Sequence, residues 1–416
     1  MKSKLLILIV VCLALNATAQ KKLTLQECYD LVDQNYPLGK QLDLLNQKTT
    51  FEIDALNTAK LPKMDLNAQA TYQSEVIGFP TALSGVNTMN KDQYRATMDI
   101  NQLIYNGGAI AAHAKLKQAQ TKTQQQQVAL NIYATKNKIN QYFFSILLLQ
   151  QKKELLESKD ELLISKVKEV TVGVKYGALL PTSELILEAE RLKIKQQLTE
   201  ISFEKTKMLE NLALLTYSEM DATTVLETPN SEREAVNGIR PEIVFFDLQN
   251  EQIESSKSVL AKSNSPKLYA FGQAGYGNPG LNMLDNSFQP FYIVGLKTSW
   301  NIFDWGKVKK DRKSLNVAQE IVQTEKENFE LNHKMELQQI NKDIKKMEEL
   351  LTSDLEIIQI HEKIVKSADA QMKNGVIASS EYLTEVIRLF EAKNNLAQHE
   401  VTLHLALANY QVSAGN

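Results

Sequence analysis

The chain has 416 residues, and its 43% apolar content excludes general disorder. The net charge of −2 lacks the basic excess that is typical of nucleic-acid-binding proteins. Only 16 Gly and 9 Pro occur along the chain, so turns are few and the sequence predicts long secondary-structure elements.

Residues 1–19 have the pattern of a secretory signal peptide, with two early lysines, an apolar core and a small-residue cleavage site ending at Ala19. A lipid anchor at Cys12 is an alternative that its large apolar neighbours disfavour. Cleavage would leave Cys28 as the single cysteine, so we expect no internal disulfide and interpret this thiol as a packing residue. After the signal peptide the sequence has no run of about 18 apolar residues, so it predicts no transmembrane helix. An exported protein without such a helix is soluble, attached to a surface or a β-barrel.

The first repeat begins with a capping box at Thr24 and Glu27, which predicts a helix that bends at Pro37 and runs to about Lys60. A strand at about 64–73 follows, in which polar and apolar residues alternate without a slip. Ten residues is the length that a tilted strand needs to cross a bilayer. A second alternating strand covers about 93–105.

A helix is then predicted from about 109 to 172, with apolar residues at coiled-coil spacing. It turns at a tip covering 173–181 and returns to about residue 215. A polar linker, 216–238, separates this first repeat (20–215) from a second one (239–416).

Matching distances identify the repeat. Pro37 and Pro62 are 25 residues apart, as are Pro241 and Pro266. The spacing from Gly108 to Gly177 is 69 residues and recurs between two later glycines, Gly306 and Gly375. The second repeat therefore predicts strands at about 268–276 and 291–303 and a helical tip at 373–379. Tyr269 and Phe271 lie on the expected polar face of the third strand.

Four strands cannot close a barrel, and an open edge in lipid leaves backbone groups unpaired. Closure needs several chains, and a polar inner face suits the water-filled lumen of a larger barrel. The alternative is a small sheet that packs its apolar face on the helices. The barrel-lumen candidates share the polar face of the strands: Asp65, Asn67, Gln69, Arg95, Asp99 and Lys297.

With its strand endings Tyr105-Asn106-Gly107-Gly108 and Phe303-Asp304-Trp305-Gly306, and with a glycine tip before each returning helix, the chain resembles the TolC family of outer-membrane efflux proteins. The resemblance implies a mainly α fold with a β-barrel part: a homotrimer whose twelve-stranded outer-membrane β-barrel continues as a long periplasmic α-helical barrel. Residues 216–238 would contribute to an equatorial belt. It also implies a passive exit duct in a Gram-negative outer membrane, joined through a periplasmic adaptor (membrane fusion) protein to an inner-membrane pump of RND or ABC type.

The resemblance implies an acidic aperture at the helical tips, where an aspartate often stands six residues after the tip glycine and again three residues later. Here those positions hold Glu381 and Thr384, with Glu385 beside the latter; in the first repeat Ser183 is followed by Glu184. One acidic ring is expected and a second is in doubt. Alternatively, Glu381 and Glu184 are acids favoured by the helix macrodipole. Candidate adaptor contacts at the tips are Gly177, Pro181 and Gly375.

Motifs for catalysis, cofactor binding or metal binding are not found: the five His lack a metal-ligand pattern, and Gly107-Gly108 lacks the Lys of a phosphate loop. We therefore expect no enzyme, no cofactor and no nucleic-acid partner. The alternatives to an efflux duct are a type I protein-secretion duct and a periplasmic coiled-coil adaptor or scaffold without a pore.

Overall fold

A computed structural model describes residues 22–77, 89–221, 223–229 and 238–415. The expected signal peptide, Cys12 and residues 222 and 230–237 of the linker lie outside these residues. The chain divides into two compact units. We call residues 41–127 and 243–327 the sheet unit, and residues 1–40, 128–242 and 328–416 the tip unit.

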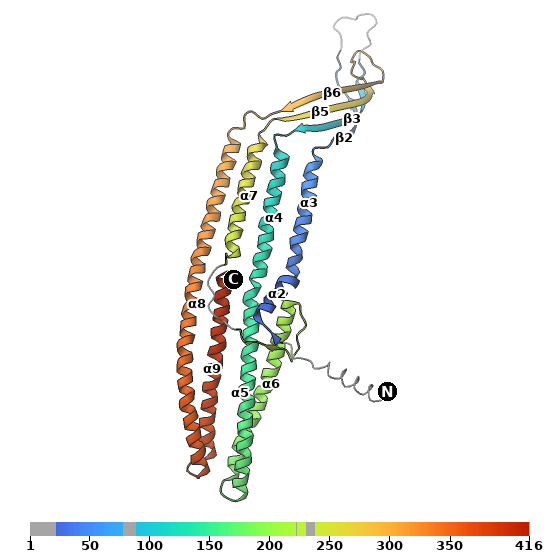
Figure 1. Cartoon of the computed structure of the whole chain (residues 1–416). Coiled ribbons are helices and arrows are strands. Elements are labelled where there is room, and N and C mark those ends of the chain that lie inside the picture. Colours follow the sequence, from blue (N-terminus) through green and yellow to red (C-terminus); the bar gives the residue numbers. More distant parts are fainter. Residues whose placement is uncertain (1–21, 78–88, 222, 230–237, 416) are drawn as a thin grey trace, which may run out of the picture. The chain divides into compact units, whose positions relative to one another are not determined.

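The sheet unit contains one antiparallel sheet with strand order β2-β3-β5-β6 (Figure 1). Its strands are β2 (Lys63–Tyr72), β3 (Asp92–Tyr105), β5 (Lys267–Asn278) and β6 (Gln289–Ser299). The two hairpins meet where β3 pairs with β5, and a register shift lies between Leu103 and Tyr105. In the described part of the chain, β2 and β6 each pair on one side only, so both edges of the sheet are open.

The pairing register keeps the polar face of β2 and β3 in phase with one face of β5 and β6. Asp65 pairs with Asp99, Asp99 with Gln273, and Gln273 with Ile293, so these side chains lie on one face. The other face is apolar and exposed: Leu66 is 82% and Tyr292 76% accessible. The alternative in which helices cover this apolar face is therefore wrong for the single chain.

The fourth strand ends earlier than predicted, at Ser299 rather than near residue 303. Ser299 pairs with Lys267, which is the first residue of β5, so later residues have no strand opposite them. The indole of Trp300 instead donates a hydrogen bond to the carbonyl of Asn264 at 3.1 Å.

The helices of the sheet unit are arranged in the same order as the strands to which they connect. They are α3 (Lys40–Thr58), α4 (Ala109–Tyr133), α7 (Pro241–Ser263) and the first part of α8 (Lys307–Lys373). Ion pairs join neighbours: Lys117 with Glu52 between α4 and α3 at 3.1 Å, Lys122 with Glu251 between α4 and α7 at 3.0 Å, and Lys326 with Asp247 between α8 and α7 at 3.1 Å. The helix α3 precedes β2 and α8 follows β6, so the edge helices belong to the edge strands.

The tip unit contains two long helical hairpins. One consists of α5 (Thr135–Lys175) and α6 (Pro181–Thr216), the other of the end of α8 and α9 (Ser379–Ser413). One apolar core lies near the tips and includes Leu163, Leu187 and Val386. A second core includes Phe143 and Leu212 together with α2 (Leu25–Asn35). The short strands β1 (Lys22–Leu23) and β4 (Val225–Leu226) pair in parallel beside it.

Two predicted helices are interrupted. The first is divided into α2, a 3-10 turn (Pro37–Gly39) and α3, because Tyr36 is extended before Pro37 and proline lacks the N–H that would continue the helix. The long helix divides at Ala134, next to Thr135, whose hydroxyl donates to the carbonyl of Ile132 at 2.6 Å. The capping box is confirmed, since Thr24 and Glu27 bond each other's backbone N–H.

Cys28 is fully buried in the core around α2, and this burial raises the pKa of its thiol to about 12. Among the described residues, no helix combines the length and the apolar character that a membrane crossing requires.

Candidate functional site

The polar face of the sheet is organised around the carboxylate of Asp99. It accepts hydrogen bonds from Asn67 on β2 at 2.7 Å, from Gln273 on β5 at 2.6 Å and from Thr97 at 3.1 Å. Side chains of three strands are thereby joined on one face. Such a face offers hydrogen-bonding groups to water, while the opposite face is mainly apolar.

The two helical tips have the same turn. In each, the residue after the glycine donates its N–H to a carbonyl five residues back, Ala178 to Gly173 and Val376 to Gln371. Gly177 and Gly375 have φ of +75° and +71°, in the left-handed region that favours glycine. These are Schellman turns, which satisfy the last carbonyls of α5 and α8 and bring the chain back sharply.

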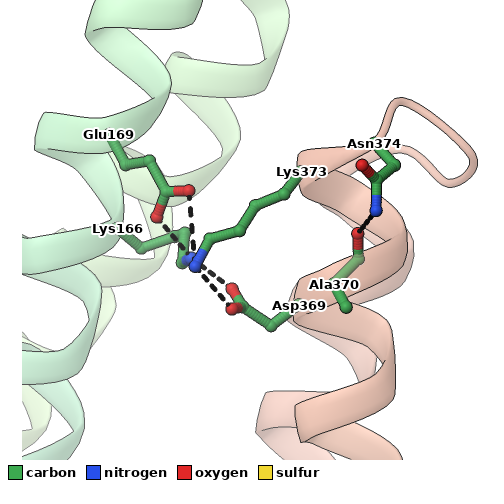
Figure 2. A network of polar contacts seen from close by, with 6 residues as sticks. All are labelled: Lys166, Glu169, Asp369, Ala370, Lys373 and Asn374. Atoms are coloured by element: carbon green, nitrogen blue, oxygen red, sulfur yellow. Dashed lines mark hydrogen bonds and ion pairs between the residues drawn. The ribbon is translucent and has the colours of Figure 1, made fainter.

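A network of charges joins the two hairpins close to these tips (Figure 2). The ammonium of Lys166 on α5 contacts Glu169 at 2.6 Å and Asp369 on α8. Lys373 on α8 contacts Asp369 at 2.9 Å and reaches Glu169 at 3.7 Å. The ring of Tyr382 on α9 lies 5.1 Å from the Lys166 ammonium. The network therefore connects three of the four helices of the two hairpins, α5, α8 and α9.

These contacts change the pKa values of the network. Burial by itself would raise the pKa of Asp369, but hydrogen bonds from Lys166 and Lys373 lower this pKa below 3.8. Burial likewise opposes the charge on Lys166, yet the bonds to Asp369 and Glu169 raise its pKa above 10.5. Burial raises the pKa of Tyr382 to about 12. The lowered pKa of Asp369 and the raised pKa values of Lys166 and Lys373 favour the charged forms of these three groups at neutral pH.

No family model matches the sequence, and no curated protein is similar to it in sequence. Solved structures do match. A crystal structure of CusC, described in terms of transmembrane channel formation, covers 94% of this chain and 92% of its own, with a TM-score of 0.71 and 11% identity. VceC, an outer membrane protein of Vibrio cholerae, covers 94% and 96% with a TM-score of 0.66 and 14% identity. The MtrE outer membrane channel of Neisseria gonorrhoeae covers 94% and 89% with a TM-score of 0.63 and 14% identity.

The chain has the TolC-type fold. The agreement extends over almost the whole chain and includes both the sheet and the helical hairpins. The predicted fold class, mainly α with a β-barrel part, is thereby confirmed.

In this TolC-type fold the six lumen candidates share one face of the sheet, but they do not form one cluster. Asn67 and Asp99 are bonded directly, whereas Asp65 contacts Lys63 at 3.1 Å. Gln69 pairs with Arg95, whose guanidinium lies over the ring of Phe291 at 5.4 Å. Lys297 lies in the second hairpin, opposite Tyr269.

The tip candidates separate into two groups. Glu381, Thr384 and Glu385 line one shallow groove between α8 and α9, together with Ile364, Ser367, Ala368, Gln371 and Ile377. Glu184 lies outside this set and accepts a hydrogen bond from Thr171 on α5 at 2.6 Å. Glu184 and Glu381 lie on the returning helices, α6 and α9, of the two different hairpins. Gly177, Pro181 and Gly375 are exposed in the two turns.

Sequence reasoning missed the Lys166–Asp369 contact and the contribution of Gln273. Both partners of Lys166 are ordinary charged residues of coiled-coil-like helices, and no sequence pattern distinguishes them. Gln273 could have been found, since it occupies the polar phase of the third strand. Among the described residues, no cluster of three or more His, Cys, Asp or Glu has the arrangement of a metal site.

Proposed function

We propose that this chain is the outer-membrane channel of a tripartite efflux or export system, a passive duct from the periplasm to the exterior of a Gram-negative cell. The observation that carries the proposal is the sheet of the single chain. It has two open edges, one exposed apolar face and one polar face joined through Asp99.

This sheet is unsuited to a monomer in either solvent. In water the exposed apolar face is unfavourable, because roughly 25 cal/mol is lost for each Å² of apolar surface left exposed. In lipid each unpaired backbone group at β2 and β6 costs several kcal/mol. Pairing β6 of one copy with β2 of the next removes both edges and turns the apolar faces toward lipid. Three copies give a closed barrel of twelve strands.

Edge helices of the sheet unit support the same assembly. Leu44 and Phe51 are exposed on α3, and Val317 and Ile321 are exposed on α8. These two surfaces differ, so contact between them is head to tail and closes into a ring. The number of copies, three, is taken from the TolC family.

Exposed apolar residues also mark the edge helices of the tip unit. Leu192 and Phe203 are exposed on α6, and Leu355 and Ile360 are exposed on α8. Contacts between copies at these surfaces would continue the ring as a helical tube in the periplasm. The equatorial belt, expected partly from residues 216–238, would surround this tube.

At the tips, Glu381, which lines the groove with Thr384 and Glu385, would contribute one carboxylate per copy and so three to a threefold aperture. Carboxylates around an axis attract cations and repel one another, so the aperture would be cation-sensitive. The Lys166–Asp369 network would hold the two hairpins of each copy together and thereby keep the aperture narrow.

The exposed tip turns are the proposed contact with the adaptor protein. They carry exposed apolar side chains: Tyr176 and Leu180 next to Gly177 and Pro181, and Val376 next to Gly375. An inner-membrane pump of RND or ABC type would supply the energy, and the channel itself would catalyse no reaction.

Two measurements test the proposal. The full chain, purified from outer-membrane fractions in detergent, should have the mass of three copies by light scattering, and it should conduct ions in planar bilayers. A monomeric protein without conductance would reject the channel and favour a periplasmic scaffold. If the channel forms, a deletion strain distinguishes the two kinds of duct. Loss of an efflux duct would sensitise cells to small toxic molecules, whereas loss of a type I secretion duct would leave an exported protein inside the cell.

A further inference from the structure

The polar face of the second hairpin differs from that of the first. Along β5 and β6 this face carries a row of four apolar side chains. From the helix end of the sheet toward the far end they are Tyr269, Phe271, Ile293 and Phe291. They occupy four successive rungs, which span about 20 Å. We call these four residues the apolar track.

Two glycines make room for the rings of the track. A Cβ on Gly295 would lie 2.9 Å from the ring of Phe271, and one on Gly275 would lie 2.5 Å from the ring of Phe291. Each ring therefore occupies space that a side chain at the glycine of the neighbouring strand would fill. Phe271 is only partly buried, so one side of its ring remains accessible.

Cations flank the track at both ends. Lys297 is opposite Tyr269, and Lys267 precedes it on the same face. At the far end the guanidinium of Arg95 covers Phe291, which is buried beneath it. β5 and β6 contain no Asp or Glu, and neither Lys297 nor Arg95 has an ion-pair partner among the described residues. The carboxylates Asp65 and Asp99 lie on the first hairpin.

From this combination we propose that the apolar track is a binding path for anionic aromatic small molecules inside the channel. An aromatic body stacks on Tyr269 and Phe271 while its acidic group contacts Lys297, and Arg95 on Phe291 offers a second cationic contact further out. The inference rests on the proposed function, because it places the polar face of the sheet in the lumen.

Block of single-channel current tests the path. Sodium naphthalene-2-sulfonate, added to the side of the loops that follow β2 and β5, should reduce the current at a concentration at least tenfold below that needed for cyclohexanesulfonate. A naphthyl trimethylammonium salt, which has the same ring system and the opposite charge, should block less than the sulfonate.

Variants distinguish binding along the apolar track from a general effect of lumen charge on the block. Lys297→Gln and Phe271→Leu should each raise the blocking concentration of naphthalene-2-sulfonate at least tenfold, with block measured as a fraction of each variant's own unblocked current. Lys63→Gln is the matched control, because Lys63 is a lysine on the same face in β2, two strands away from Phe271. Equal effects of Lys63→Gln and Lys297→Gln, or equal block by the two sulfonates, would overturn the inference and leave the channel intact. A chain without any conductance would instead overturn the proposed function itself, and this inference with it.

Discussion

Lys166 of α5 is hydrogen-bonded to Asp369 of α8, although 203 residues separate them in the chain. The side chain of Lys166 is 8% exposed, and it also contacts Glu169 on its own helix. This contact belongs to neither hairpin alone, so it opposes any movement that separates them.

Asp369→Asn tests that role. The substitution leaves Lys166 largely buried without its carboxylate partner across the hairpins, which costs about 1–3 kcal/mol. We expect the two hairpins to separate more easily and the single-channel conductance in planar bilayers to rise at least twofold. Asp343→Asn is the control, because Asp343 pairs with Lys346 on the same helix in an exposed position. If both variants conduct like the parent, the network has no part in the aperture.

The pH dependence of the tip follows from the same groups. The pKa of Asp369 is lowered, so its stabilising contribution is present above 3.8 and is lost as the pH falls through the lower value of the folded protein. The pKa values of Lys166 and Lys373 are raised, so their contributions are present below 10.5 and are lost only at higher pH. We therefore expect a conductance that is constant from pH 5 to 8 and rises at lower pH. A rise already between pH 7 and 5 would contradict this assignment.

Glu381→Ala should raise single-channel conductance or abolish block by divalent cations, because it removes one carboxylate per copy from the proposed aperture. Glu184→Ala is the comparison, since Glu184 is bonded to Thr171 and lies outside the groove of Glu381. The Glu184 variant should change the block less than twofold. Unaltered conductance and block in the Glu381 variant would favour the alternative in which this acid only stabilises the start of α9.

Assembly depends on exposed apolar side chains of the edge helices. Leu192→Ser combined with Phe203→Ser on α6 should shift the protein from trimer to monomer in detergent, measured by light scattering. Phe203 is 76% exposed in the single chain, so the helical circular-dichroism signal should not change. Lys193→Ser, on the neighbouring polar side of α6, should leave the trimer intact. If the double variant and the Lys193 variant are both trimeric, the contact between copies does not depend on Leu192 and Phe203.

Local patterns predicted several elements well. The capping box at Thr24 and Glu27 begins α2 as expected, and β2 and β3 start within one residue of the alternating segments. Gly177 and Gly375 stand at positive φ in the two tips. These features depend on the period of a strand, on a cap or on a backbone conformation open to glycine, and each is encoded within about ten residues.

The order of the hairpins and the pairs between distant residues were not predictable in this way. Pairing of β3 with β5, the covering of Phe291 by Arg95 and the separation of Glu184 from Glu381 all depend on long-range register. A shift of one residue in register would move every side chain of a strand to the other face.

The sequence by itself determined the duplicated plan, the two-faced strands and the glycine turns, because alternation, capping and φ preferences act between near neighbours. Only the tertiary structure decided that Lys166 bonds Asp369 and that the rings of Phe271 and Phe291 lie over glycines. Those contacts are set by the rotation of long helices and the register of strands, which chain segments some 200 residues apart adopt only when they pack together.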